Sequence, residues 1–177
     1  MDIQGFYAVV AVTCFALAGL WWNVVNGKPQ WRERPELRRL SAGVYQSFLV
    51  PGLMSFGAQL AGTQTAIWRS VFVIAALAGG ACTVQLIRLT PVSGRGMFGR
   101  HRWVVVVLYA VIAVFGLFPE LAREIELEPL QAEGILVSLL MLAGHALAWE
   151  FMYGPETHEP QPADQRTDGQ FAPPSPP

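Results

Sequence analysis

Two ionisable residues, one near the middle and one near the end of an apolar run, are the first candidates for chemistry. His145 and Glu150 both belong to the stretch 135–153. A histidine at membrane depth can relay protons, bind a metal or haem, or form a hydrogen bond between helices. On a helix the two side chains would point about 140° apart, because each residue turns the helix by about 100°. The pair therefore does not form a ready acid–base site, and we predict no catalytic residue.

Other polar residues inside apolar runs need an explanation of the same kind. Arg69 stands near the start of the run 67–87, where it could reach lipid headgroups, pair with nearby glutamates or bind an anion. Gln46, Gln59 and Gln85 could line a polar path beside a helix kinked at Pro51. We take His145, Glu150, Gln59 and Arg69 as a candidate polar site within the membrane.

Metal and cofactor signals are weak. Cys14 and Cys82 lie in apolar runs without the spacing of metal ligands, and a second histidine at membrane depth for haem is missing. The glutamates of residues 119–134 could hold a divalent cation. Their run from Glu120 to Glu128 instead favours a short surface helix with Leu121 and Ile125 turned inward. We expect no metal and no cofactor.

The composition is that of a membrane protein. Of the 177 residues 53% are hydrophobic and 14% are charged, against about 25% charged in soluble domains. The mean hydropathy is +0.36 and the net charge is −1, so bulk charge predicts no nucleic-acid partner. The preference for arginine over lysine, with much Ala, Gly, Val and Pro, is typical of a protein from a GC-rich bacterial genome.

Five apolar runs have roughly the length that a bilayer requires, which is about 20 residues per helix. We predict an all-α membrane protein in which residues 1–153 form a five-helix transmembrane bundle. The first run has no basic segment before it, which favours a retained helix over a cleaved signal peptide. A Pro-rich tail, 154–177, is expected to be disordered and cytoplasmic. The predicted spans are 5–25, 44–62, 67–87, 103–118 and 135–153.

The arginines predict the orientation of these spans. Nine of the twelve basic residues lie in the connections 26–43 and 88–102. Short cytoplasmic loops collect Lys and Arg, so both connections should lie inside and the N-terminus outside. We expect Arg32, Arg34, Arg38 and Arg39 to contact lipid headgroups. Five tryptophans near the ends of the runs fit anchors at the membrane surface: Trp21, Trp22, Trp68, Trp103 and Trp149.

Small residues predict how the second and third spans meet. Gly57 and Ala61 lie four residues apart, as do Ala75 and Gly79. Such spacing lets helix backbones approach closely in lipid, so we expect an antiparallel hairpin through these faces.

The function predicted from these features is that of a non-catalytic accessory or scaffold component of a cell (inner) membrane. Its expected partners are the lipid bilayer and a membrane protein or a second copy of the chain. The alternative is a small oligomeric transporter or channel-like protein that uses the Pro51 helix break and His145.

Overall fold

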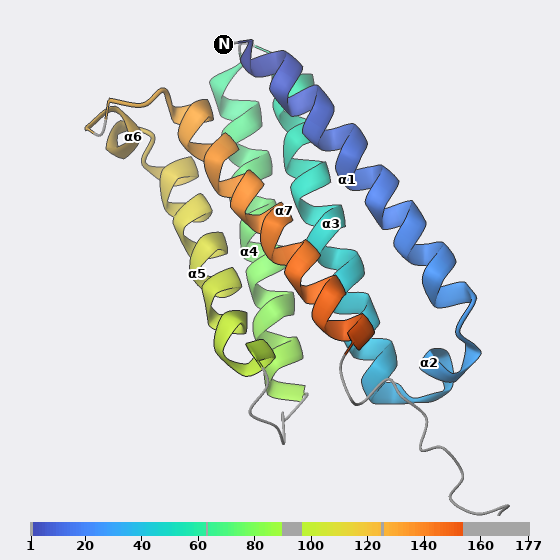
Figure 1. The fold of residues 1–177 in the computed structure, drawn as a ribbon. Coiled ribbons are helices and arrows are strands. Elements are labelled where there is room, and N and C mark those ends of the chain that lie inside the picture. The colour runs from blue at the N-terminus through green and yellow to red at the C-terminus, as the bar shows by residue number, and fades with distance from the viewer. Residues whose placement is uncertain (1, 63, 90–96, 125, 154–177) are drawn as a thin grey trace, which may run out of the picture.

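Five long helices lie side by side in the computed structural model, which describes residues 2–62, 64–89, 97–124 and 126–153 (Figure 1). Every element within these ranges is an α-helix, so the prediction of an all-α protein is confirmed. Two short helices lie in connections at opposite ends of the bundle, and we use them to name the α6 end and the α2 end. The predicted tail 154–177 lies outside the described residues. The helices are α1 (Ile3–Asn26), α2 (Pro29–Glu33), α3 (Pro35–Ala61), α4 (Thr65–Leu89), α5 (Met97–Leu117), α6 (Glu120–Glu124) and α7 (Pro129–Tyr153).

Three of the described helices are long and apolar enough to cross a membrane: α1, α4 and α7. The apolar part of α5, Trp103–Leu117, is shorter, and α3 is not among the three. Helices of this length and hydropathy are typical of membrane proteins, and the general class predicted from composition therefore holds.

Helix α3 packs against α1, α4 and α7, while α5 packs against α4 and α7. Glycines set the close approaches. A Cβ atom on Gly57 would lie 2.4 Å from Val71 Cγ1 of α4, and one on Gly144 of α7 would lie 2.7 Å from Ser47 Oγ. Helix α3 continues through Pro51, which is fully buried, and ends at Gly62, whose φ of 53° suits glycine.

All five long helices begin before the predicted spans, and three of them begin at least six residues earlier. Helix α3 begins at Pro35 rather than at 44, α5 at Met97 rather than at 103, and α7 at Pro129 rather than at 135. The predicted basic loop 26–43 thus contains α2 and the first turns of α3. Hydropathy marks only the part of a helix that matches the hydrocarbon thickness, whereas proline at the first helical position starts the helix further out.

Two expectations about which side chains face outward need correction. Trp21 and Trp68 are buried, and Trp21 Nε1 donates to the Ser41 carbonyl (2.9 Å); Trp22, Trp103 and Trp149 are exposed. In α6 the buried residue is Ala122, while Leu121 is exposed and Ile125 lies outside the described residues. Proximity to a helix end does not decide which face of the helix a residue occupies, because successive residues point about 100° apart.

Candidate functional site

The most unusual polar group in the bundle is the carboxyl of Glu133. Its side chain is 0% exposed, and neither oxygen has a hydrogen-bond partner among the described residues. The sequence prediction had placed Glu133 in the outer connection 119–134. The structure places it in the second turn of α7, on the face that also buries Val137, Leu140 and Gly144. The spacing of these four residues, at steps of four, three and four, is the signal that could have identified Glu133 as an inward-facing residue.

Tyr7 and Gly116 lie next to this carboxyl. Tyr7 of α1 is fully buried and its hydroxyl donates to the Leu130 carbonyl of α7 (2.7 Å). The Tyr7 ring also meets Phe72 of α4 edge to face, with ring centroids 6.1 Å apart. A Cβ atom on Gly116 of α5 would lie 3.7 Å from Glu133 Oε1. Glu133 is therefore enclosed by α1, α5 and its own helix at the α6 end.

Arg69 binds the last carbonyl groups of α5. Its Nε donates to the Gly116 carbonyl (2.8 Å) and its Nη2 to the Leu117 carbonyl (2.6 Å). A cation at a helix C-terminus satisfies carbonyls that have no partner within the helix. Arg69 also lines an open groove of about 390 Å³ between α4 and α5, together with Ser70, Val73 and Gly116. Sequence reasoning had considered headgroups, glutamates and anions as partners of Arg69, but not the end of α5.

His145 lies on the outer surface of α7, beside α3. Its ring meets the buried Phe48 edge to face at 5.3 Å, and Nδ1 lies 2.9 Å from the Met141 carbonyl. A carbonyl only accepts, so Nδ1 carries the hydrogen in this bond, and in the neutral ring Nε2 is an acceptor. The side chain is exposed, and no bond from Nε2 to a described residue is present.

The other members of the predicted polar site do not join His145. Glu150 is half-buried in the last turn of α7, and Gln59 is half-buried near the end of α3. Arg69 lies at the α6 end, on α4. The structure instead brings Arg69 close to Glu133, since both reach Gly116.

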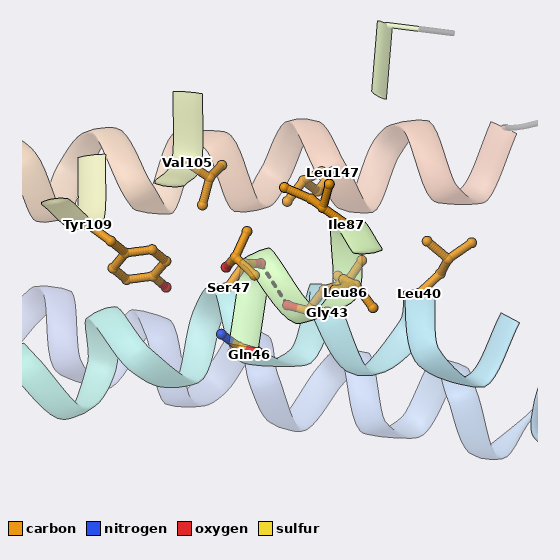
Figure 2. A pocket seen from close by; sticks show the side chains of 11 residues that line it. Leu40, Gly43, Gln46, Ser47, Leu86, Ile87, Val105, Tyr109 and Leu147 are labelled. Carbon is orange, nitrogen blue, oxygen red and sulfur yellow. Dashed lines mark hydrogen bonds between the residues drawn. The ribbon is translucent and has the colours of Figure 1, made fainter. Parts of the chain in front are cut away.

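Two of the three glutamines, Gln46 and Gln85, line one groove, and Gln59 does not. Gln46 Nε2 donates to the Gly79 carbonyl (3.0 Å), which also accepts from Thr83 Oγ1 (2.8 Å). Gln46 lines a small cavity of about 40 Å³ at the α2 end, mostly walled by apolar side chains such as Leu40, Leu86 and Leu147 (Figure 2). Organic ligands generally need about 300 Å³ or more, so this cavity suits water at most. Gln46 and Gln85 both line an open groove beside Arg39, and Gln59 is not among its lining residues.

The predicted packing residues lie at two different interfaces. Gly57 and Ala61 are buried in α3, and Gly57 faces Val71 of α4. Gly79 of α4 faces α5 instead, where a Cβ atom would lie 2.7 Å from the Tyr109 ring; Ala75 is half-buried. The four basic residues expected at headgroups, Arg32, Arg34, Arg38 and Arg39, are exposed at the α2 end.

Cysteine and metal chemistry finds little support in the geometry. Both cysteines are free, and Cys14 Sγ lies 3.8 Å from Met141 Sδ in the bundle core. Among the described residues, no group of three or more His, Cys, Asp or Glu side chains could hold a metal ion.

Comparison with known proteins gives no relative: no family model, no curated protein and no solved structure matches this chain. Its class is therefore defined by its own helices, and any role must be argued from its own side chains.

Proposed function

We propose that all five long helices cross the inner membrane of a bacterial cell, with the N-terminus outside and the C-terminus in the cytoplasm. Helix α3 packs along α1 and α4, which are long and apolar enough to span. A helix lying parallel to two spanning neighbours lies at their depth. Large apolar side chains are also exposed on every long helix, as acyl chains require. These include Val12, Leu53, Ile74, Val107 and Leu142.

The charge distribution supports the same threading. Arg32, Arg34, Arg38 and Arg39 lie at the α2 end, and the glutamates Glu120 and Glu124 of α6 lie at the other. Short loops rich in arginine stay on the cytoplasmic side, so the α2 end faces the cytoplasm in this proposal.

Within that membrane the protein acts as an accessory or scaffold component that docks another membrane protein or a second copy of itself through the His145 face of α7. The observation that carries this proposal is the outward position of His145 near the middle of the predicted span 135–153. Ionisable side chains at such depth almost always face protein or water rather than lipid. A donor on a partner helix would satisfy Nε2, and such hydrogen bonds join helices in membranes.

The transporter alternative has less support from the geometry. Helix α3 is continuous through Pro51, so the described helix offers no break at which a substrate site could form. His145 points away from the interior that Pro51 occupies. We therefore favour the docking role.

Site-specific photocrosslinking in cells tests the docking role. A photoreactive phenylalanine analogue at 145 should give a protein adduct of discrete mass, because the partner helix covers this side chain. The same analogue at Leu77, a 62% exposed residue of α4, is the matched control for a lipid-facing site. Mass spectrometry of the adduct separates a second copy from a different protein.

His145→Leu supplies the complementary measurement. Loss of one interhelical hydrogen bond should weaken the association by about 3- to 30-fold, corresponding to about 0.6–2 kcal/mol. The thermal unfolding of the isolated protein should hardly change, because the hydrogen bond of His145 lies within its own helix and leucine keeps an apolar contact with Phe48. Equal crosslinking at 145 and 77, or no adduct at 145, would refute the docking role.

A further inference from the structure

We propose that Glu133 is a proton-binding site, open toward the groove between α4 and α5 at Gly116, and that Arg69 is the partner of its ionised form. This inference rests on residues other than His145, which carries the docking role. A failure of one proposal would therefore leave the other standing.

The first observation is that the Glu133 carboxyl is buried without a hydrogen-bond partner. Glu133 is 0% exposed and both of its carboxyl oxygens lack hydrogen bonds to the described residues. An ionised carboxylate in such surroundings is strongly disfavoured, whereas the neutral acid is far less costly to bury. Glu133 therefore holds its proton in the observed arrangement, in which the Arg69 side chain of α4 binds the end of α5.

The ionisable groups around the carboxyl support this assignment. From α1, Tyr7 is near enough for an electrostatic interaction with Glu133, but its hydroxyl hydrogen is already given to Leu130. From α4 the nearest charged residue is Arg69, and from α5 the residue at this level is Gly116. Helix α3 has no charged residue after Arg39. The charged side chains of α6, Glu120, Arg123 and Glu124, are exposed, as is Glu128 before α7.

Gly116 is the second observation, because Glu133, Arg69 and Val73 all lie close to it; Val73 Cγ2 is nearest, 2.8 Å from the position of the missing Cβ atom. The position of its missing Cβ atom is 3.7 Å from Glu133 Oε1 and 3.7 Å from the Arg69 carbonyl oxygen. The Arg69 guanidinium binds the carbonyl of the same glycine, and Arg69 and Gly116 both line the open groove. Gly116 and the Val73 side chain thus lie between the buried acid and a basic side chain that lines the open groove.

Arg69 has a second arrangement within its reach. If its side chain leaves the Gly116 and Leu117 carbonyls, these end groups of α5 can bond to water at the groove, as free helix ends do. The guanidinium can then pair with Glu133 across Gly116. In this step the carboxyl O–H bond breaks, the proton passes to groove water, and the carboxylate charge is balanced by the arginine. Proton release is thus coupled to the contact between α4 and α5.

Infrared spectroscopy on the full chain in lipid nanodiscs, with carboxyl-labelled glutamate, tests the proposal. The stretch of a protonated carboxyl should be present near neutral pH, disappear in alkali, and be missing from Glu133→Gln at every pH. Glu128→Gln removes an exposed glutamate directly before α7 and should leave the band unchanged. A wild-type spectrum without this band at neutral pH overturns the proton site.

Arg69→Gln tests the partner. Without the arginine the ionised carboxylate loses its counter-charge. The band should therefore disappear only at a proton concentration at least about tenfold lower than in the wild type. An unchanged pH dependence overturns the role of Arg69.

Wild-type protein alone gives a measurement that does not depend on the folding of any variant. A hydrophobic carbodiimide adds to protonated carboxyl groups, and the product keeps the full mass of the reagent. Mass spectrometry should find this addition on Glu133, declining as the pH rises. No modification of Glu133 across the pH range overturns the proposal.

Discussion

Polar side chains within this bundle bind backbone carbonyls of neighbouring helices more than they bind one another. Tyr7 donates to Leu130, Gln46 to Gly79 and Arg69 to Gly116, in each case from one long helix to another. Apolar burial alone does not join helices in lipid, because acyl chains are as apolar as leucine. These side chain-to-carbonyl bonds therefore fix which helix faces meet, whereas the buried side chains of Glu133 and Ser55 have no hydrogen-bond partner among the described residues.

Tyr7→Phe measures one of these bonds at the residue scale. The substitution keeps the buried ring and removes only the hydroxyl that donates to Leu130. We expect the free energy of unfolding to fall by about 0.5–1.5 kcal/mol, measured by titration with denaturing detergent in mixed micelles. Tyr153→Phe is the control, because Tyr153 is 65% exposed and should change stability by less than about 0.5 kcal/mol. Equal effects of the two substitutions would contradict a stabilising role for the Tyr7 bond.

At the scale of the elements, glycines decide how closely α3 approaches its neighbours. Gly57 has Val71 Cγ1 at 2.4 Å from its Cβ position, and Val71 is β-branched, so its side chain has little freedom to turn away. Gly19 of α1 has nothing within 4 Å of the corresponding position. The same substitution should therefore have opposite effects at these two glycines.

Gly57→Ala and Gly19→Ala form a matched pair. Overpacking at Gly57 should destabilise the protein by about 1–3 kcal/mol, because α3 and α4 must move apart. Gly19→Ala should be neutral or stabilise by up to about 1 kcal/mol, since alanine favours the helix and meets no neighbour. Detergent unfolding of both variants beside the wild type provides the measurement. Destabilisation by Gly19→Ala as large as that by Gly57→Ala would show that the α3–α4 contact is not what limits stability.

The positions of the long helices could be predicted from hydropathy, but not their first turns or their inward faces. The predicted span 135–153 lies wholly within α7, yet α7 begins at Pro129 and so includes Glu133. A hydropathy window responds to the membrane, whereas proline, backbone hydrogen bonding and packing determine where a helix starts. The pair Trp21 and Trp22 illustrates the second limit: neighbours in sequence, one is 5% and the other 58% exposed. Facing depends on which helices meet, and the hydropathy of the sequence does not show which they are.

At the scale of the whole molecule, the two ends of the bundle differ in charge and in chemistry. The α2 end holds the exposed arginines and a buried aromatic cluster of Trp21, Trp31 and Phe151. The α6 end holds the buried Glu133 and the Arg69 that binds α5. If the α6 end faces the outside, the proton site lies close to the outer aqueous phase, since Glu133 is only about 6 Å along the axis from the start of α7.

Cysteine labelling in intact cells tests this orientation and the number of crossings together. In a background with Cys14→Ala and Cys82→Ala, single cysteines replace Gln30 at the α2 end, Gln64 between α3 and α4, and Gln131 in the first turn of α7, all exposed positions. A membrane-impermeant maleimide should label positions 64 and 131 in intact cells, but position 30 only after permeabilisation. This pattern requires α3 to cross, because positions 30 and 64 lie on either side of it. Labelling of 30 and 64 from the same side would remove α3 from the spans, and labelling of 30 alone would invert the bundle and place Glu133 toward the cytoplasm.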